Sequence, residues 1–589
     1  MRLIGRILGF LLRTVVRLAY FALAAVGFVV VGLILLVAFL GAGTVEVVRE
    51  RTVARVPEAV VLVADWRDGV PEKTRGFGVG AFGFDGGMAL PRVLAAMERA
   101  VEDDRVRGFV ARIDGAGIGA AQAWELREAV AELRAAGKFT ALYADTLGEL
   151  GGGMVATYLA SAFEHVQLQP LGTLGFTGLA REQPYFGRLL DELAIERQVV
   201  KREDFKSALE AFTRSEPSPE SEQMTERLLD GLFAAFVEGV AEARGLDAAA
   251  VRTAVDRAPL LGEEAMARGL VDAVGHEPAL WEAVEGAAGT EERLPLAQYA
   301  AAPLDEEPAA RVGFVHAVGP IVRGRSEDPF GDLEITGDTY AEAIDAAREA
   351  EVDVLLVRVS SPGGSAVASE TVAAAVRRAK DAGIPVIVSM GDVAASGGYW
   401  ISMDADRILA APTTLTGSIG VITGKPAIGD FLADLGIDVA IERRGANAGF
   451  GSVFDPWDAR AMERVNVLVD DLYTSFLEGV ARGRDLDVAA VRAVAGGRVW
   501  LGAEAVENGL VDEAGGFLAA VAAAREAAGV AADAPLALEP FPRPVPPFRA
   551  FVDEFGRFLS AGAEMRDLWQ SLAAAPALRF EAGSLPRPD

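Results

Sequence analysis

Apolar runs alternate with amphipathic stretches along most of the chain. Val352–Val359 is a nearly continuous apolar run that predicts a buried strand, Ser369–Lys380 has one apolar face and predicts a helix, and Ile384–Met390 predicts a second buried strand. The run Ala59–Val63 predicts the first strand of an earlier unit with the same rhythm. Strands that alternate with helices in this way indicate an α/β fold with parallel strands.

Two such units fill the middle of the chain. Residues 296–310, rich in proline and acidic side chains, predict a linker, so the units span residues 55–295 and 308–530. The proline-rich run Pro540–Pro547 excludes a helix or a central strand, because proline lacks the backbone donor and fixes φ. Residues 540–589 therefore predict a tail, which includes one amphipathic helix.

The first 45 residues differ from the rest. Several arginines precede an uncharged apolar run, Leu18–Val45, which as a helix is long enough to cross a membrane core of ~30 Å. A secretory signal has a shorter apolar region, of about 7 to 15 residues, so residues 1–45 predict an uncleaved transmembrane anchor. Arginines before the anchor predict a cytoplasmic N-terminus. For a bacterium, this places a single-pass protein in the inner (cell) membrane with its body on the periplasmic side.

Short motifs show that the second unit repeats the first. The matched segments, first copy before second, are 151–153 and 396–398, 171–175 and 416–420, and 261–272 and 501–512. The glycine frame survives in the first copy, but glycine stands there in place of Ser396. Conversely, Phe205–Ala208 contains Lys206, whereas the corresponding stretch Ala446–Gly451 has no lysine. The duplicate has therefore divided a nucleophile and a base between its halves.

The motifs together resemble signal peptide peptidase A, also called protease IV, in its long form with two repeats. The strings that carry the resemblance are Phe205–Ala208, Val359–Gly364, Ala394–Trp400 and Thr416–Gly420. Each string alone is weak, because short Gly/Ser runs are common in turns. The resemblance covers residues 55–530 and implies a duplicated spiral fold of the kind shared by Clp proteases and crotonases. It also implies a bowl-shaped homo-oligomer, a tetramer in this family, and substrates that are signal peptides left in the membrane after cleavage.

Charge and composition narrow the classes of function. The formal net charge of −29 argues against a nucleic-acid partner, since such proteins need a basic stripe. The sequence has no cysteine, which excludes disulfides and cysteine-based metal or thiol chemistry. Nothing in the sequence indicates a metal or an organic cofactor.

A serine hydroxyl needs a base to take its proton. We expect structural roles for the three histidines, which lie outside the glycine motifs: His165, His276 and His316. A Ser-His-Asp triad is recognised by geometry rather than by order, so the sequence leaves it open without supporting it. Lysine serves as a base when burial lowers its pKa from ~10.4 to about 7 or 8. This shift is equivalent to a free-energy change of roughly 4 kcal/mol between the charged and the neutral amine.

Lys206 is the lysine that the resemblance assigns as the base. Its apolar neighbours in the sequence are compatible with a dry pocket. Three nearby carboxylates oppose the loss of its proton, and we expect them to face outward: Glu203, Asp204 and Glu210. Lys201 and Lys380 are competing candidates outside the family motif.

Ser396 follows a predicted strand and precedes a predicted short helix, which places its oxygen near free backbone N–H groups. We expect an oxyanion hole from the amide of Gly397 together with the amide of Gly363 or Gly364, because glycine permits close approach and unusual φ. The alternative is that Ser396 only caps the helix. The resemblance gives Ser418 a hydrogen bond to the lysine, although a purely structural turn stays open, since threonine stands there in the first copy.

The sequence thus predicts a membrane-anchored serine endopeptidase with a Ser396/Lys206 dyad, acting through an acyl-enzyme on cleaved signal peptides and similar apolar peptides. A non-catalytic scaffold of the same fold would predict loss of the serine or the lysine, and both persist. A crotonase-like acyl-CoA enzyme is the other alternative, which a body outside the cytoplasm disfavours. We expect apolar substrate pockets, and we expect Tyr399 and Trp400 to lie in the core. Whether the dyad forms within one chain or between chains stays open.

Overall fold

The computed structural model describes residues 56–74, 88–115, 117–149, 151–303, 307–326 and 333–543. These residues belong to one compact unit, Val56–Pro544. The predicted anchor at residues 1–45 and the tail from residue 544 onward lie outside the described residues, so both stay predictions. Within the described ranges, no helix combines the length and the apolar character that crossing a membrane requires.

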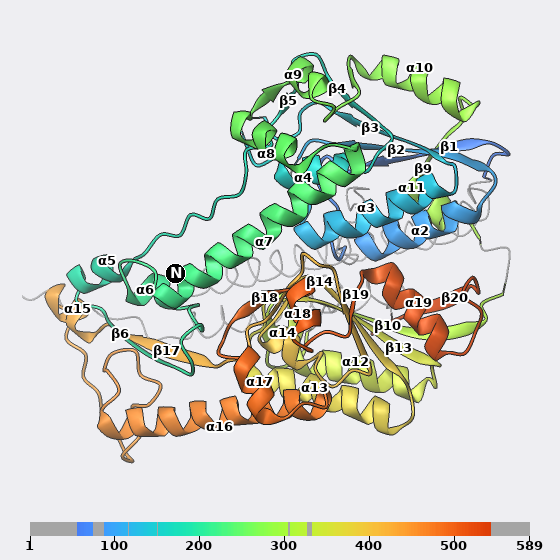
Figure 1. Ribbon diagram of the computed structural model, residues 1–589. Coiled ribbons are helices and arrows are strands. Elements are labelled where there is room, and N and C mark those ends of the chain that lie inside the picture. The colour runs from blue at the N-terminus through green and yellow to red at the C-terminus, as the bar shows by residue number, and fades with distance from the viewer. Residues whose placement is uncertain are drawn as a thin grey trace, which may run out of the picture. The chain divides into compact units, whose positions relative to one another are not determined.

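The first repeat is built on a six-stranded sheet in the order β8-β4-β3-β2-β1-β9. All neighbouring strands in it run parallel. Their bounds are β1 Val60–Asp65, β2 Val106–Ile113, β3 Phe139–Ala144, β4 His165–Leu168, β8 Ala273–Val274 and β9 Arg293–Pro295. Helix α10 (Glu277–Ala288) packs on one face, and α2 (Leu90–Glu102) and α3 (Ala120–Ala135) run side by side along the other (Figure 1). The strands are apolar on both faces because both faces are covered.

The second repeat has a larger sheet, in the order β18-β16-β14-β13-β10-β20, with β15 beside β14 and β19 beside β15. Its pairs are parallel except β16 with β18. The bounds are β10 Ala310–Val318, β13 Val354–Ser361, β14 Val386–Ala395, β15 Arg407–Ala410, β16 Leu415–Gly417, β18 Val499–Leu501, β19 Glu513–Ala514 and β20 Leu536–Phe541. The two strands predicted at 352–359 and 384–390 are β13 and β14. Strand β20 contains Pro540 and lies at the end of the strand order, where a missing donor is tolerated.

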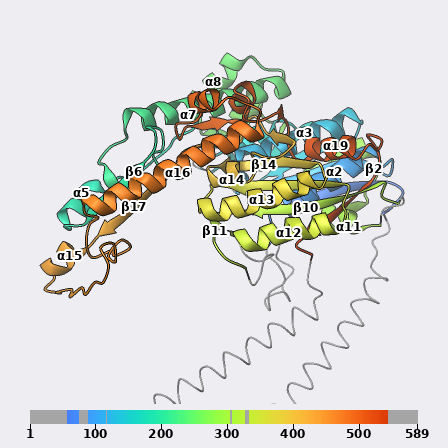
Figure 2. The ribbon, with the colours of Figure 1, turned by 90° about the horizontal axis from the view of Figure 1, so that it is seen from below.

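Helices α12 (Gly337–Glu349) and α13 (Ala366–Asp381) lie side by side against the second sheet, as Figure 2 shows, and supply much of its core. Helix α13 is the helix predicted at Ser369–Lys380. It begins earlier because the Ser365 side chain accepts a hydrogen bond from the Ala368 N–H at 3.3 Å and so caps its first turn. Helix α19 (Phe517–Ala527) contacts β13, β14 and α2, which places it between the repeats.

The two repeats also share a two-stranded sheet outside the two main sheets. Strand β6 (Glu196–Lys201) of the first repeat pairs antiparallel with β17 (Ile422–Ala427) of the second. Helix α16 (Ala459–Gly483) packs against β6 through Val465, Val469 and Val200, and it runs beside this strand pair in Figures 1 and 2. The chain that follows β6 is thereby carried onto the second repeat.

Part of the predicted linker 296–310 is regular structure. Strand β9 pairs with β1, and the next residues form helix α11 (Leu296–Ala301), which contacts β1 and α2. Tyr299 of this helix is fully buried, and its hydroxyl donates to the Asp103 carboxylate at 3.0 Å. The sequence did not predict this short helix, because the prolines and acidic residues that follow it dominate the composition of residues 296–310.

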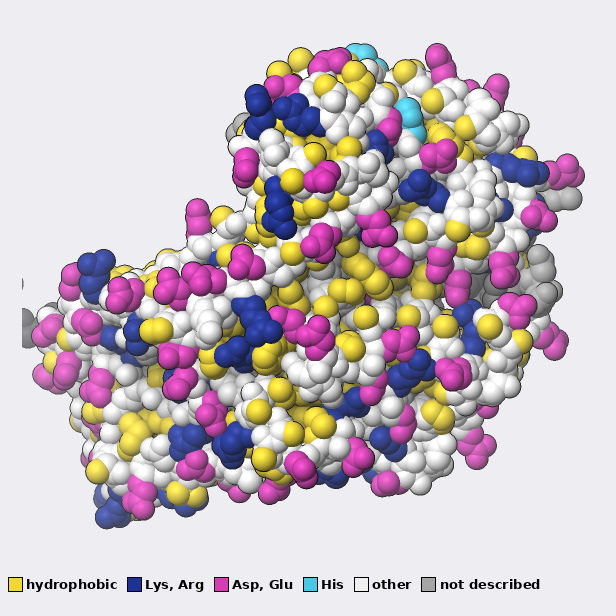
Figure 3. Space-filling model, viewed as in Figure 1, with side chains coloured by type: hydrophobic (Ala, Val, Ile, Leu, Met, Phe, Trp, Pro, Cys, Tyr) yellow, Lys and Arg dark blue, Asp and Glu magenta, His cyan; other side chains and the backbone are white. Residues whose placement is uncertain are grey.

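A buried arginine joins the two repeats. Charged side chains of both signs are interspersed over the face that Figure 3 shows, but Arg358 of β13 is fully buried. Its guanidinium lies 2.7 Å from the carboxylates of both Glu72 and Glu125, which belong to the first repeat. His316 lies 3.4 Å from Glu72 in the same cluster, which agrees with a structural role for this histidine. The guanidinium of the second repeat therefore bridges two buried carboxylates of the first.

A second contact of this kind caps a helix. The Asp392 carboxylate on β14 accepts a hydrogen bond from the Ala121 N–H in the first turn of α3, at 2.8 Å. Gly119 precedes this helix, and any side chain there would overlap the Asp392 carboxylate. A carboxylate from one repeat thus serves as the N-terminal cap of a helix in the other.

We predict that Arg358→Met destabilises the protein by about 3 to 5 kcal/mol, because Glu72 and Glu125 then lose their buried partner. The midpoint of urea denaturation, followed by tryptophan fluorescence, measures the effect. The control is Arg67→Met, which removes an exposed pair with Asp65 and is expected to cost less than about 1 kcal/mol. Equal losses in the two variants would contradict the role given to Arg358.

Candidate active site

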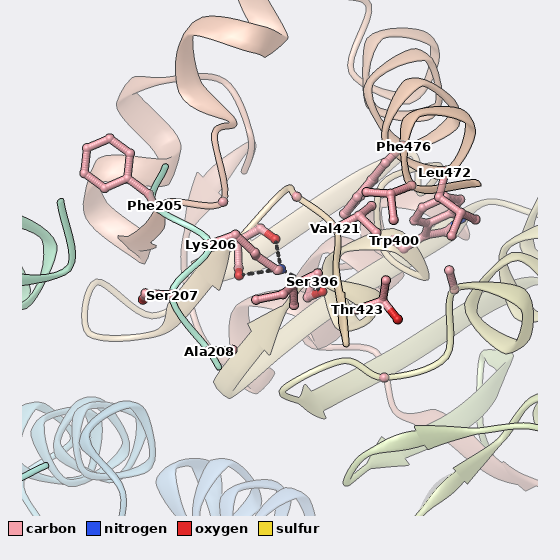
Figure 4. Close-up of a pocket in the computed structure, with 18 of the residues that line it drawn as sticks. Phe205, Lys206, Ser207, Ala208, Ser396, Trp400, Val421, Thr423, Leu472 and Phe476 are labelled. Carbon is pink, nitrogen blue, oxygen red and sulfur yellow. Dashed lines mark hydrogen bonds between the residues drawn. The ribbon is translucent and has the colours of Figure 1, made fainter. Parts of the chain in front are cut away.

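Lys206 belongs to the first repeat but lies against the second. After β6, the Arg202 N–H donates to the Val421 carbonyl at 2.9 Å, and the Phe205 N–H donates to the Gly496 carbonyl at 3.1 Å. These two backbone bonds fix the segment on either side of its turn. The lysine side chain points inward, toward Ser396 (Figure 4), and is only 6% exposed.

Ser396 follows the last residue of β14 and precedes the four-residue helix α14 (Gly397–Trp400). Its φ is 54°, a left-handed conformation that is uncommon outside glycine and is often found at functional sites. Its N–H donates to the Gly417 carbonyl at 2.9 Å, and its side chain makes no capping hydrogen bond. The hydroxyl is therefore not used as a helix cap, the alternative that the sequence left open.

The lysine amine meets both serines within one chain. Lys206 Nζ lies 3.1 Å from Ser396 Oγ and 3.0 Å from Ser418 Oγ, and it donates to the Ser418 carbonyl at 2.7 Å. Ser418 also has a left-handed backbone, with φ of 51°, and its N–H donates to the Arg498 carbonyl at 2.7 Å. Both the hydroxyl and the carbonyl of Ser418 thus orient the amine toward Ser396.

Burial lowers the pKa of Lys206 to about 8. An ammonium loses its hydration in such a place, which disfavours the charged form. Desolvation is the one cause of this shift, so no carboxylate offsets it. The amine is thus prepared to accept a proton close to neutral pH.

The three carboxylates near Lys206 in the sequence are kept from it in different ways. Glu203 and Asp204 are exposed, as expected. The expectation that Glu210 faces outward is wrong, because this residue is only 7% exposed. Its carboxylate accepts from the Ser218 hydroxyl at 2.8 Å and lies 3.5 Å from Lys201 Nζ. A buried carboxylate beside the site is therefore satisfied by groups other than the candidate base.

The competing lysines have partners elsewhere. Lys201 donates to the Asp204 carbonyl at 2.9 Å in addition to its ion pair with Glu210. Lys380 donates to the Asp404 carbonyl at 2.6 Å and pairs with Asp406 at 3.1 Å.

The described residues contain no group of three or more His, Asp or Glu side chains that could hold a metal ion.

Two glycine segments bring backbone amides close to Ser396, where an oxyanion hole was expected. Gly363 and Gly364 follow β13 with φ of 97° and 156°, and they lie against the start of α14. The Gly363 N–H donates to Ser361 Oγ at 3.1 Å, so this amide is already occupied. A Cβ placed on Gly397 would lie 3.1 Å from the nitrogen of Gly364, which shows how closely these two residues approach. Of the two alternatives from the sequence, the contacts favour Gly364 as the partner of Gly397.

A cavity of about 620 Å³ opens beside the two serines and the lysine. Its walls are mostly apolar, and α16 contributes many of them, a contribution that the sequence did not identify. The side chains from this helix are Val465, Leu468, Val469, Leu472 and Phe476. Val421 and Thr423 line the same cavity near Ser396 (Figure 4). The cavity therefore accepts an apolar group next to the serine hydroxyl.

Trp400 lies in the core, as expected, and it also lines this cavity, which the sequence did not predict. Its ring lies 4.5 Å from that of Phe476, and its indole N–H donates to the Glu370 carboxylate at 2.9 Å. The position directly after Gly397–Tyr399 gave no signal for this, because the cavity forms only when α16 packs over α14. Tyr399 is fully buried, as expected.

Comparisons with known proteins identify the family to which the chain belongs. The model of peptidase family S49 matches residues 135–290 and 378–531, one segment in each repeat. Protease 4 of Haemophilus influenzae is 32% identical over 452 residues, which are 73% of this chain and 71% of that protein. The chloroplastic serine protease SPPA of Arabidopsis thaliana is 27% identical over 472 residues, 78% of this chain and 69% of that protein. Among solved structures, a ClpP1 variant of Listeria monocytogenes is similar with a TM-score of 0.23 and 13% identity, over 34% of this chain and 91% of that one.

We predict that Lys206→Met stabilises the protein below pH 8. The pKa of this lysine is about 8 when folded and 10.5 when unperturbed, so folding at low pH buries a charged amine. That cost is on the order of 3 kcal/mol and disappears as the pH rises from 8 toward 10.5. Urea denaturation of both proteins at pH 6 and pH 10 measures it. A variant that is less stable than the parent at pH 6 would contradict the burial of charge at this position.

Proposed function

Since the chain belongs to peptidase family S49 and is a serine protease, we propose that Ser396 is its nucleophile and Lys206 its general base. The observation that supports this most directly is the distance of 3.1 Å between Lys206 Nζ and Ser396 Oγ at the edge of an apolar cavity. A base within hydrogen-bond reach of a hydroxyl, itself oriented by a third group, is the arrangement that activates a serine. Ser418 is that third group.

The geometry suits an acyl-enzyme mechanism. Neutral Lys206 accepts the proton of the Ser396 hydroxyl as Oγ attacks the peptide carbonyl carbon. The N–H groups of Gly364 and Gly397 stabilise the tetrahedral oxyanion. When the C–N bond breaks, Lys206 gives its proton to the departing amine, and an ester remains on Ser396. Lys206 then takes a proton from water as the water attacks the ester, and returns it to Ser396 Oγ when the acid product leaves.

The lowered pKa makes this mechanism workable near neutral pH. With a pKa of about 8, roughly one Lys206 side chain in ten is neutral at pH 7. At the ordinary value, fewer than about one in a thousand would be. The gain in neutral base is therefore on the order of 100-fold, and it comes from burial alone.

The substrates we propose are apolar peptides, above all signal peptides that remain after cleavage. The apolar walls contributed by α16 and by Trp400 support this class. Residues 1–45 would anchor the protein in the bacterial inner membrane with its catalytic body on the periplasmic side, close to such peptides. Assembly into a homo-oligomer, a tetramer by resemblance, belongs to the same proposal.

Ser396→Ala and Lys206→Ala are each expected to lower cleavage of a fluorogenic apolar peptide by on the order of 1000-fold or more, because each removes a partner of the proton transfer. The full chain purified in detergent is used, and circular dichroism verifies folding. Lys380→Ala is the control, since this lysine is held by Asp404 and Asp406. Near-parental cleavage by either dyad variant would refute the assignment.

The rate should also follow the protonation of Lys206. We predict that kcat/KM rises through about pH 8, the pKa of the lysine, and levels off above it. The sign follows because only the neutral amine can accept the serine proton. Initial rates between pH 5.5 and 9.5, supported by single-turnover measurements of acylation, give the profile. An acylation rate that does not change over this range would exclude Lys206 as the base.

A further inference from the structure

A short turn of the second repeat, residues 496–498, is hydrogen-bonded to the segments that carry Lys206 and Ser418. The Gly496 carbonyl accepts the Phe205 N–H at 3.1 Å, next to Lys206, and the Arg498 carbonyl accepts the Ser418 N–H at 2.7 Å. Between them, the Gly497 N–H donates to the Ile419 carbonyl at 2.9 Å. The turn is thus bonded on one side to the segment that carries the lysine and on the other to the segment that carries Ser418.

Gly497 lies so close to Lys206 that no side chain fits between them. The φ of Gly497 is 79°. A Cβ added to this residue would lie 2.5 Å from the backbone nitrogen of Lys206, 2.6 Å from the Lys206 Cβ and 2.7 Å from the Lys206 Cα. Contacts between heavy atoms at these distances are repulsive. Backbone atoms of Lys206 could relieve them only by moving as a whole, because they are not the flexible end of a side chain.

The lysine stem is enclosed from a second direction by Gly420. A Cβ on this residue would lie 3.3 Å from Lys206 Cδ and 2.9 Å from the Gly497 Cα. The stem therefore runs past two bare α-carbons. Above the turn, the Arg498 guanidinium stacks on the Phe205 ring with 3.8 Å between its carbon and the ring centroid, and that ring points away from Ser396 (Figure 4).

We propose that Gly497 is a positioning residue for Lys206: its bare α-carbon lets the lysine of the first repeat sit against the second at the depth where the amine reaches Ser396 and is shielded from water. The consequence for catalysis rests on the proposed function, but the seating of the lysine does not. A methyl group at residue 497 pushes the Lys206 backbone outward, lengthens the reach to Ser396 and lets water approach the amine.

Gly497→Ala tests this against Gly509→Ala. Gly509 has nearly the same φ, 77°, but an added Cβ would meet only the ends of the Leu486 side chain at 3.8 Å or beyond. Both variants therefore carry the same backbone strain, and only one crowds Lys206. A fall in stability common to both is the effect of strain and is subtracted by this comparison.

The first readout needs no catalysis. In full chains that also carry Ser396→Ala, the pH dependence of Lys206 acylation by a small amine-reactive reagent is followed by peptide mass spectrometry. Gly497→Ala is expected to move the labelling midpoint of Lys206 upward by about one pH unit or more, because a hydrated amine holds its proton more firmly. Gly509→Ala is expected to leave the midpoint unchanged.

The second readout is kinetic. With Ser396 intact, Gly497→Ala is expected to lower kcat on the order of 100-fold with little change in KM, since a misplacement of about 1 Å has this effect on a reacting pair. The rising limb of its pH profile moves to higher pH, which a loss of folded protein alone would not cause. If Gly497→Ala does not fold, Gly420→Ala, which crowds the stem less, is expected to shift both readouts in the same direction by smaller amounts.

The outcomes separate the two proposals. Equal labelling midpoints and equal pH profiles for Gly497→Ala and Gly509→Ala would overturn the positioning role. If Lys206→Ala cleaves peptides normally while Gly497→Ala still raises the labelling midpoint, Lys206 is not the general base. The positioning role of Gly497 would nevertheless be supported.

Discussion

The desolvation of the Lys206 amine is the constraint on which the arrangement of the site depends. Burying an ammonium is unfavourable. At Lys206, hydrogen bonds to two oxygens of Ser418, rather than an ion pair with a carboxylate, offset part of the desolvation free energy. Neither repeat encloses the amine alone. The pairing of β6 with β17 brings the lysine segment across, and the 496–498 turn receives it. The boundary between the repeats is therefore also the wall of the site.

Division of the machinery between two copies explains which constraints each copy retains. In the second copy, the Ser396 N–H is bonded to Gly417 at the end of β16, and Ser418 turns toward the lysine. In the first copy, Gly153 takes the place of the serine, since it precedes helix α4 (Met154–Ala160) and its N–H donates to the Gly175 carbonyl at 2.8 Å. Phe176 follows Gly175 as Ser418 follows Gly417, and it is a fully buried apolar side chain where there is no amine to orient. The glycine frame persists because the backbone path is shared, whereas the side-chain chemistry is not.

The sequence predicted what is local and periodic. Strands β13 and β14 and helix α13 were found from their apolar spacing, and the repeats located Ser396 and Lys206 on opposite halves. The burial of Glu210, the place of Trp400 in the cavity wall and the closeness of Gly497 to Lys206 were not predicted. Each of these depends on segments far apart in the chain, and a single sequence carries no record of which distant segments meet. The same holds for Arg358, whose partners lie in the other repeat.

Because the chain is strongly acidic, Lys206 must be kept apart from nearby carboxylates if its pKa is to stay low. A chain with a net charge of −29 surrounds this amine with carboxylates that would raise its pKa if they came near. Glu203 is exposed and pairs with Arg492 at 3.0 Å, whereas Glu210 is buried and held by Ser218 and Lys201. Since these carboxylates are held elsewhere, desolvation is the cause that lowers the pKa of the lysine, and the shift depends on how deeply the amine is buried. The depth of burial is set by backbone contacts around the lysine stem, so the pKa of the amine depends on how the two repeats pack against each other.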